Sequence, residues 1–424
     1  MKVKNLESFI LEHENEDTSR LLLSKSKWPD IDMDRAVTAI ECRKRIKHKL
    51  PSWYAEPSIL YPDRICTEQC SSEETARYKA EIIGKIIGNC RLADLTGGLG
   101  VDSAAFSNIC SRVLYNEMDP KRAAAAEHNF KALGISNVSI TSSEITPGCD
   151  YFSSVLAEFH PDIIYLDPAR RSSSGNKVFL LEECLPDVLS LIPDILSITP
   201  NLLLKLSPMA DISMIIRRLE SNRLSVKDVH CVSSDGECKE LLVYATGFDS
   251  QKQCNLTIYE NGKTKTFSSD EEKQNTPILM DGEDKLTEKK YLFEPGKSLS
   301  KAGLFNTISH CYPFPTKAGI HTHLYFLDRL PNEGEESITD FGKLFEIISI
   351  SSLNKQNITK LGKEYRNCEV TSRNLRMSSE ELRKKLKSSS GGDVHIFGIR
   401  VDFNSSSSCK KNGDNYLVVT RRVR

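Results

Sequence analysis

Three places in the sequence put chemically useful residues directly after an apolar run. In RLADLTGGLG (residues 91–100), Asp94 precedes a turn that contains three glycines. Glycine has no Cβ and tolerates positive φ, so such a turn lets backbone N–H groups approach a ligand. Glu117 follows the run VLYN, and Asp167 follows DIIYL. These patterns predict strand ends that present carboxylates beside a glycine turn.

The elements that would position these residues alternate along the chain. The expected strands are 91–95, 113–117, 138–141, 162–166 and 201–206, and the expected helices between and after them are 103–109, 120–133, 180–190 and 211–220. This alternation predicts a parallel sheet with helices on both faces. In such a sheet, ligands bind at the carboxyl ends of the strands.

The next two apolar runs, 229–233 and 241–245, are joined by the polar loop 234–240. The loop is too short for a helix, so the two runs should form an antiparallel hairpin. A nicotinamide dehydrogenase would continue with βα units and carry G-x-G-x-x-G spacing, which GGLG lacks. The hairpin and the glycine spacing therefore disfavour an oxidoreductase.

The motifs DLTGGLG, NEMDP and DPARR together resemble those of class I S-adenosylmethionine-dependent methyltransferases, over residues 68–246. More specifically, the chain resembles a bacterial group of methyltransferases with ferredoxin-like and THUMP-like C-terminal domains. The resemblance implies an α/β, Rossmann-like sheet that is parallel with a terminal antiparallel hairpin. It also implies S-adenosylmethionine as the cofactor and methyl transfer as the activity.

In this resemblance, Asp94 and the glycine turn hold the amino acid part of the cofactor, and the acid suits its ammonium group. Glu117 accepts from the ribose, Met118 packs on the adenine, and Glu144 faces the adenine amino group. The expected cofactor-binding residues are Asp94, Thr96, Gly97, Gly98, Gly100, Asp102, Glu117, Met118, Ser143, Glu144 and Asp167. Purely structural roles remain open: Asp94 could cap a helix, and Glu144 could be an exposed loop acid.

The expected catalytic residues are Asp167, Pro168 and Arg170. Methyltransferases of amino groups hold the exocyclic amine at this position, and typically have a second proline and a stacking aromatic where this chain has Ala169 and Arg170. The expected substrate-binding residues are Arg170, Arg171, Glu237 and Lys239. The arginines could bind phosphate or stack on a base. Alternatively, either could pair with Glu237 or Glu240.

The composition is that of a globular protein with several domains. The chain has 424 residues, 39% hydrophobic and 27% charged, with a formal net charge of −1. That charge does not indicate a globally basic nucleic-acid binder, although a local basic face is compatible with it. The 13 cysteines include no CxxC pair, so free thiols are expected and no metal site. No signal peptide or apolar membrane span is evident, and we expect a cytoplasmic protein.

Four domains are expected: an all-α N-terminal domain (1–66), the methyltransferase domain (67–250), a linker with a small ferredoxin-like subdomain (251–328) and a THUMP-like α+β domain (329–424). The segment 36–49 is basic and could be a docking face or a solvated helix flank. Segment 69–78 could contact the cofactor or only pack on the sheet. Basic residues also recur in 383–387 and 421–424, near the C-terminus.

The sequence supports three functions. The first is a methyltransferase of RNA, on a ribosomal or transfer RNA base, with the THUMP-like part binding RNA. The second is a methyltransferase of a protein or small molecule, which the weak net charge and the missing aromatic keep open. The third is a protein that binds S-adenosylmethionine or RNA without turnover.

Overall fold

The computed structural model describes residues 6–170, 181–247, 253–404 and 413–423. The chain forms two compact units. One comprises Met1–Val229 with Leu241–Lys252, and the other His230–Glu240 with Gln253–Arg424. Each unit is described by itself below.

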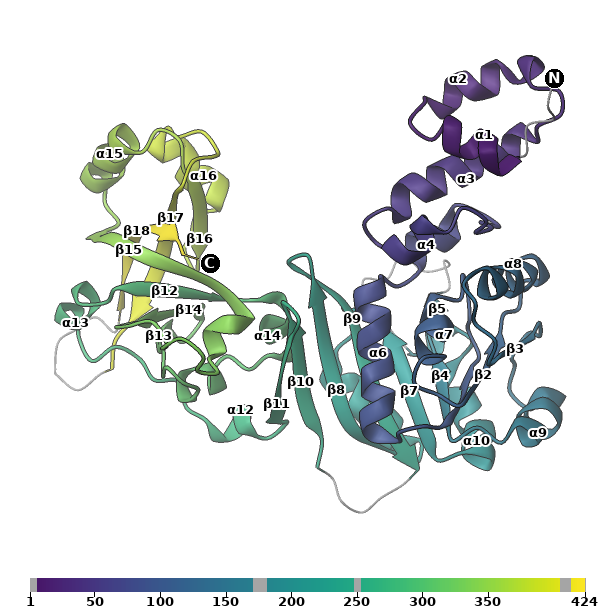
Figure 1. Cartoon of the computed structure of the whole chain (residues 1–424). Coiled ribbons are helices and arrows are strands. Elements are labelled where there is room, and N and C mark those ends of the chain that lie inside the picture. The colour runs from purple at the N-terminus through teal and green to yellow at the C-terminus, as the bar shows by residue number, and fades with distance from the viewer. Residues whose placement is uncertain (1–5, 171–180, 248–252, 405–412, 424) are drawn as a thin grey trace. The chain divides into compact units, whose positions relative to one another are not determined.

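The first unit is built on a sheet in the order β8-β9-β7-β4-β1-β2-β3 (Figure 1). Five strands are parallel: β1 (Arg91–Asp94), β2 (Arg112–Asn116), β3 (Val138–Thr141), β4 (Ile163–Leu166) and β7 (Asn201–Leu206). Strand β9 (Glu237–Gly247) runs antiparallel to β7, and β8 (Leu224–Ser234) follows in the order. The predicted parallel sheet with a terminal antiparallel hairpin is confirmed.

Helices of this unit flank the sheet, and four of them begin at a side-chain cap. The helices are α6 (Glu73–Ile86), α7 (Val101–Phe106), α8 (Pro120–Ala132), α9 (Ala157–Phe159), α10 (Val188–Ile198) and α11 (Ile212–Ser221), with a π-helical turn at Phe152–Leu156. The side chain of Ser72 accepts the N–H of Thr75 at the start of α6. Aspartates cap α8, α10 and α11 in the same way, which satisfies N–H groups that the helix leaves unpaired.

The helix predicted at 180–190 is wrong. Leu181–Glu183 form a 3₁₀ turn, and Cys184–Leu185 form strand β6, which pairs with β5 (Ala169–Arg170). Helix α10 begins only after Pro186 and Asp187. Proline has no N–H to continue a preceding helix, and the Asp187 carboxylate accepts the N–H of Ser190, which fixes the later start.

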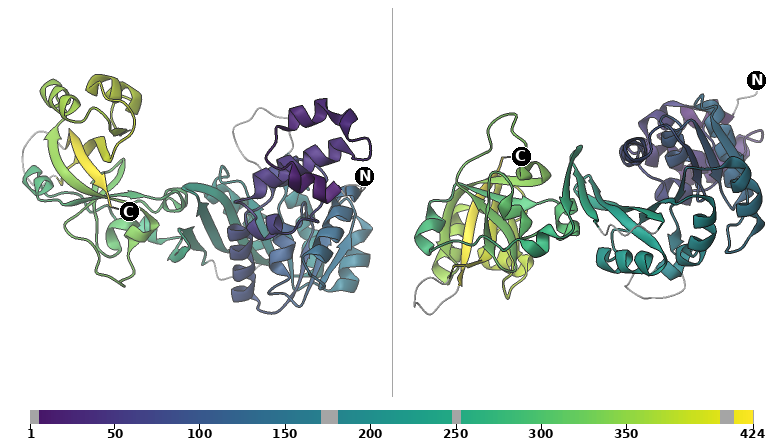
Figure 2. Two further views of the ribbon diagram at one scale, coloured as in Figure 1. Left: turned by 45° about the horizontal axis from the view of Figure 1, so that its top comes forward. Right: turned by 90° about the horizontal axis from the view of Figure 1, so that it is seen from below.

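The N-terminal helices lie next to the sheet domain (Figure 2) and share a hydrophobic core with it. They are α1 (Leu6–Glu12), α2 (Thr18–Leu23), α3 (Met33–Ile46), α4 (Pro51–Ala55) and α5 (Ile65–Gln69), with a 3₁₀ turn at Lys25–Lys27. Phe9, Ile40 and Trp53 belong to the same buried cluster as Tyr115 of β2 and Phe130 of α8. The cluster therefore joins the helices to the sheet domain as one folded body.

Basic residues of α3 and the turn after it bind groups of the same chain. Arg43 donates to the carbonyl of Tyr54, and Lys44 donates to the carbonyl of Glu16. Arg45 pairs with the carboxylate of Glu68, and Lys49 donates to the carbonyls of Thr67 and Glu68. These cations tie the helices together, so at least part of the basic segment has a structural role.

The second unit contains a hairpin and a seven-stranded sheet in the order β13-β14-β12-β15-β18-β17-β16. The hairpin is β10 (Asn255–Glu260) and β11 (Lys263–Ser268), with Asn261 and Gly262 at positive φ, as the Asn-Gly pair predicts. The sheet strands are β12 (Tyr291–Pro295), β13 (Thr316–Gly319), β14 (Thr322–Leu327), β15 (Gly342–Ser352), β16 (Glu369–Arg373), β17 (Val394–Asp402) and β18 (Gly413–Arg422).

Five α-helices accompany these strands: α12 (Glu271–Gln274), α13 (Glu283–Thr287), α14 (Lys297–Ala302), α15 (Lys355–Glu364) and α16 (Ser379–Leu386). There are also 3₁₀ turns at Thr307–His310 and Ile338–Phe341. Helices α15 and α16 pack on each other through a shared apolar cluster that includes Ile358, Leu361, Leu382 and Leu386 (Figure 1). No helix among the described residues is long and apolar enough to cross a membrane.

Because the N-terminal helices and the sheet domain share one core, we expect them to unfold together. Ile40 is fully buried in α3, so Ile40→Ala should lower the free energy of unfolding by about 2–5 kcal/mol. The matched control is Leu23→Ala, since Leu23 is 87% exposed on α2, and it should change that free energy by less than about 0.5 kcal/mol. Urea unfolding followed by circular dichroism measures both. Separate melting of the N-terminal helices, with the rest of the unit unaffected, would contradict the shared core.

Candidate cofactor site

The glycine turn after β1 is held by consecutive residues at the end of β2 and just after it. The N–H of Gly97 donates to the carbonyl of Asn116 (2.8 Å), and the N–H of Gly98 donates to the Glu117 carboxylate (2.9 Å). The Tyr115 hydroxyl donates to the carbonyl of Gly98 (2.6 Å). A Cβ on Gly97 would lie 2.0 Å from the Tyr115 ring, so no larger residue fits there. Gly98 has φ +56° and nothing within 4 Å of its Cβ position, so this side of the turn is open.

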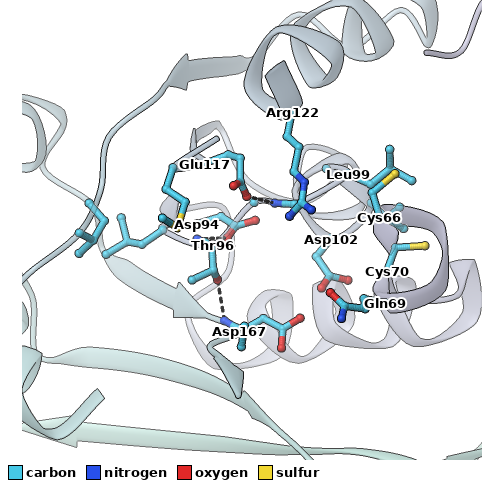
Figure 3. A pocket seen from close by; sticks show the side chains of 18 of the residues that line it. Cys66, Gln69, Cys70, Asp94, Thr96, Leu99, Asp102, Glu117, Arg122 and Asp167 are labelled. Carbon is cyan, nitrogen blue, oxygen red and sulfur yellow. Dashed lines mark hydrogen bonds between the residues drawn. The ribbon is translucent and has the colours of Figure 1, made fainter. Parts of the chain in front are cut away.

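The turn forms one wall of a cavity at the carboxyl ends of the parallel strands (Figure 3). All eleven residues expected to bind the cofactor line it: Asp94, Thr96, Gly97, Gly98, Gly100, Asp102, Glu117, Met118, Ser143, Glu144 and Asp167. They come from the last residue of β1, from α7 and from the loops that follow β1, β2, β3 and β4. The structure thus brings together residues spread over 74 positions of the sequence, from Asp94 to Asp167.

Sequence reasoning missed several lining residues. Cys66 comes from α5, Arg122 from α8, and Leu185 and Pro186 from β6 and the residue after it. Gln69 and Cys70, at the end and the C-terminal cap of α5, also line the cavity, and they lie in the segment 69–78 that the sequence offered as a possible cofactor contact. The others lack a local pattern, because tertiary packing of the N-terminal helices and of β6 places them.

Asp94 is an internal carboxyl group with only 1% of its surface exposed. One oxygen accepts the N–H of Thr96 (3.0 Å), and the other accepts the hydroxyl of Ser103 (2.6 Å). Burial raises the pKa of Asp94 to about 7, because a charged carboxylate loses its hydration there. Asp94 therefore shapes the turn through its own hydrogen bonds.

Asp102, in the first turn of α7, is the second buried carboxylate of the cavity. Its Oδ2 accepts the hydroxyls of Ser71 (3.0 Å) and Tyr165 (2.8 Å), and its Oδ1 lies 3.2 Å from the ammonium of Lys79. Burial opposes ionisation, but the charges of Lys79 and Lys205 and these two hydrogen bonds hold the pKa of Asp102 below its usual value. Near neutral pH Asp102 is thus ionised, whereas Asp94 is partly protonated.

Asp167 is fixed at both its backbone and its side chain. Its N–H donates to the Thr96 hydroxyl (2.6 Å; Figure 3), and its carboxylate lies 2.5 Å from the Lys205 ammonium. Pro168 is buried next to it. The following Ala169 pairs with Leu185 in the short β5–β6 ladder, which holds the loop beside the cavity.

The remaining expected residues are Arg170, Arg171, Glu237 and Lys239. The backbone of Arg170 pairs with Cys184 in β5–β6, while the Arg170 side chain and all of Arg171 lie outside the described residues. Glu237 and Lys239 pair with each other (2.9 Å) in the outer half of the β8–β9 hairpin, which belongs to the second unit.

Within residues 6–170, 181–247, 253–404 and 413–423, no group of three or more His, Cys, Asp or Glu side chains could hold a metal ion. The carboxylates of the cavity are instead bound to hydroxyls, backbone N–H groups and lysines.

Comparison with known proteins agrees with this fold. Residues 342–409 match a family described as THUMP domain-like, and residues 291–333 match a ferredoxin-like domain. A candidate methyltransferase from Porphyromonas gingivalis W83 has a similar solved structure: its TM-score is 0.79 at 27% sequence identity, covering 100% of this chain and 98% of that one. A search of curated proteins finds no match to the chain.

Other solved structures are similar to part of the chain. A ribosomal protein L11 methylase from Lactobacillus delbrueckii subsp. bulgaricus has 16% identity and a TM-score of 0.29, covering 41% of this chain and 78% of that one. An rRNA methylase from Streptococcus thermophilus has 12% identity and a TM-score of 0.29, covering 41% and 96%. Such values are too low to support an inference about activity.

Fold and comparisons together define a methyltransferase-like protein with the class I sheet. The chain also carries a ferredoxin-like and a THUMP-like domain after that sheet. The resemblance expected from the sequence is confirmed at this level.

The raised pKa of Asp94 predicts a pH-dependent stability. A raised carboxyl pKa stabilises the fold fully below pH about 4, and this stabilisation is lost as the pH rises through about 7. Asp94→Asn removes the titration while keeping an acceptor for Thr96. The unfolding temperature of the unchanged protein should therefore fall relative to that of Asp94→Asn between pH 4 and 8.

Thermal unfolding across this pH range measures the difference. Glu144→Gln is the control, because Glu144 is an exposed acid that lines the same cavity. A difference between Asp94→Asn and the unchanged protein that stays constant from pH 4 to 8 would contradict the assignment.

Proposed function

We propose that this protein is an S-adenosylmethionine-dependent methyltransferase that acts on a base of ribosomal or transfer RNA. The observation that carries the proposal is the convergence of the expected cofactor residues on one cavity beside an open glycine turn. The candidate methyltransferase with 27% identity, which spans the whole chain, supports the same activity.

The chemistry of the cavity suits the cofactor. The N–H groups at the start of α7 suit a carboxylate, and the Glu117 carboxylate suits ribose hydroxyls because its oxygens can accept further hydrogen bonds. Met118, which is 52% exposed, and buried Ile145 give an apolar surface for adenine. When bound, the cofactor supplies a methyl group activated by its sulfonium.

The chain's own contribution is to bind and orient an acceptor. The Lys205 ammonium binds one oxygen of the Asp167 carboxylate, and the Thr96 hydroxyl accepts the backbone N–H of Asp167. The carboxylate is thereby oriented to accept a hydrogen bond from an amino group of the acceptor. Leu185 and Pro186 form an apolar wall on that side, in place of the aromatic residue found in many methyltransferases of amino groups.

The THUMP-like part supports RNA as the substrate. Its two packed helices, α15 and α16, and the residues just after them expose seven cations: Lys355, Lys360, Lys363, Arg366, Lys384, Lys385 and Lys387. The acids exposed on the same helices are fewer: Glu364, Glu380 and Glu381. Such an excess of positive charge suits a phosphate backbone. We call these seven residues the basic patch.

Calorimetric titration with S-adenosylmethionine tests the cofactor. We expect micromolar binding by the unchanged protein and at least tenfold weaker binding by Gly98→Asp, because the new carboxylate would enter the cavity. Glu117→Ala should weaken binding similarly, since it removes the ribose acceptor and the Gly98 contact.

The matched control for Gly98→Asp is Gly134→Asp. Gly134 has a similar positive φ and open space at its Cβ position, but it does not line the cavity. Absence of binding at millimolar S-adenosylmethionine would overturn the proposed function. Binding without transfer of labelled methyl to RNA, protein or metabolite pools would favour a binding protein without turnover, and transfer to one of the other pools would replace RNA as the substrate class.

RNA binding is tested at the basic patch. The double variant Lys360→Glu with Lys384→Glu should bind total RNA at least tenfold more weakly, with a shallower dependence on salt, because fewer counterions are released. Its affinity for S-adenosylmethionine should be unchanged. A matched charge reversal on exposed lysines of α12 and α13, Lys273→Glu with Lys285→Glu, should have little effect. Equal losses in the two double variants would rule out the patch as the RNA site.

A further inference from the structure

Two aromatic rings of the ferredoxin-like part stack on each other. Phe305 lies just before the 3₁₀ turn Thr307–His310, and His323 lies in β14. Their ring centroids are 3.7 Å apart, and their planes differ by 18°. We propose that this ring pair binds an unpaired base of single-stranded RNA, and that arginines at the end of β16 and in the loop after it bind the neighbouring phosphates. The inference rests on the proposed function in taking RNA as the substrate.

The imidazole of His323 has an open face. The His323 side chain is exposed, whereas Phe305 is partly buried and covers one face of the imidazole. None of the described residues forms a hydrogen bond with this imidazole. Its exposed surface therefore includes the second face, on which a further flat ring can stack. Stacking on an aromatic side chain accepts any base, because every base has a π-face.

The charges that act on the ring pair are positive. Burial and the charges of Lys317, His321 and Arg373 lower the pKa of His323, so its imidazole is neutral near pH 7. No carboxylate contributes to this shift. The ring can therefore stack as a neutral group, while the cations around it attract the phosphates on either side of the bound base.

Lys317 is a buried cation next to the ring pair. Only 2% of the residue is exposed, and its ammonium lies 6.0 Å from the centroid of the Phe305 ring. The ammonium donates to the side-chain oxygen of Asn306 (3.0 Å), and no carboxylate of the described residues forms an ion pair with it. Glu272, whose charge favours the ionised lysine, already accepts the N–H groups of Asn306 and Thr307. The uncompensated charge favours an anionic ligand at the rings.

The THUMP-like part contributes to the same surface through the loop after β16. The side chain of Asn374, the first residue of that loop, donates to the hydroxyl of Thr322 (3.2 Å), and Thr322 precedes His323 in β14. This hydrogen bond joins the two segments that match known families, 291–333 and 342–409. The surface beside the ring pair is therefore built by both domains.

Two arginines of this region can bind phosphates. Arg373, the last residue of β16, pairs through one nitrogen with Glu294 (2.8 Å), and 47% of its side chain is exposed. Because a guanidinium has five N–H donors, it can bind a phosphate in addition. Arg376 is also exposed, and it lies just before Ser378, the N-cap of α16. Helix α16 carries Lys384 and Lys385 of the basic patch, so the loop connects the ring pair with that patch.

Binding of a single-stranded oligoribonucleotide tests the ring pair. The probe is an oligouridine of about ten nucleotides with one 2-aminopurine, whose fluorescence falls when the base stacks. His323→Ala should bind the probe at least fivefold more weakly and abolish this quenching, because it removes the open ring face. His323→Tyr keeps a ring and should bind within twofold of the unchanged protein. The matched control His310→Ala, at another exposed histidine of the second unit, should leave binding unchanged.

The salt dependence of binding separates stacking from charge. Because the imidazole of His323 is neutral, His323→Ala should leave the slope of log affinity against log salt unchanged. Arg373→Gln should make that slope shallower by about 0.7, as expected for the loss of one phosphate contact with a single strand. A slope in His323→Ala that is as shallow as that in Arg373→Gln would overturn the stacking role.

The outcomes separate this inference from the proposed function. If the protein transfers methyl groups to RNA but His323→Ala binds the probe as tightly as the unchanged protein, the proposed function stands and the ring pair is overturned as an RNA site. Absence of probe binding by the unchanged protein, or equal affinity for the corresponding duplex, would overturn it as well. If the protein fails to bind S-adenosylmethionine, the proposed activity is overturned, and the probe titration, which needs no cofactor, still decides the role of the ring pair.

Discussion

The close packing of Tyr115 beneath Gly97 is the constraint on which the cofactor site depends. Asp94 and Tyr115 are register partners in the parallel β1–β2 ladder, so the turn that follows β1 lies directly over the tyrosine ring. The ring leaves no room for a Cβ on Gly97, and its hydroxyl binds the carbonyl of Gly98. With that carbonyl bound to the core, the open side of Gly98 is available to a ligand.

The same aromatic cluster extends the constraint to the next glycine. Phe130 of α8 packs edge-on against Tyr115 at 5.6 Å and would meet a Cβ on Gly100 at 2.8 Å. Gly100 also has φ +92°, which L-residues with a side chain rarely adopt. The rings of Tyr115 and Phe130 thus explain why positions 97 and 100 are glycines. Both rings belong to the core shared with the N-terminal helices, so distant residues stabilise the shape of the turn.

Burial and charge give opposite results at the two carboxyl groups next to this turn. Both are enclosed, and burial alone would raise both pKa values. No lysine charge lowers the pKa of Asp94, so burial raises it. At Asp102 the buried Lys79 and the nearby Lys205 outweigh burial. Because Coulomb interactions strengthen as water is excluded, the Lys79 ammonium at 3.2 Å, together with Lys205 and the hydroxyls of Tyr165 and Ser71, reverses the effect of burial. Asp94 and Asp102, eight positions apart, therefore have pKa values shifted in opposite directions.

Local patterns were sufficient where an element's own residues determine its structure. The apolar runs of the parallel strands, the glycine turn and the Asn-Gly hairpin all have short-range signatures, and the cavity residues at the strand ends follow from them. The helix predicted at 180–190 was wrong. Its apolar and acidic residues resemble those of a helix, but Pro186 and the capping Asp187 place the start of α10 at Val188. The short β5–β6 pairing had no signature, since two-residue strands carry no periodicity.

The remaining wall of the cavity depends on contacts that no local pattern contains. Helix α5 contributes Cys66 and Gln69 because its neighbours in the N-terminal core hold it there. Lys49, which follows the basic helix, binds the carbonyls at the end of α5. Just beyond α5, the Ser71 hydroxyl reaches Asp102 inside the cavity. The N-terminal helices are therefore a structural part of the candidate cofactor site, and basic residues that the sequence left open as a docking face or a solvated helix flank help to build it.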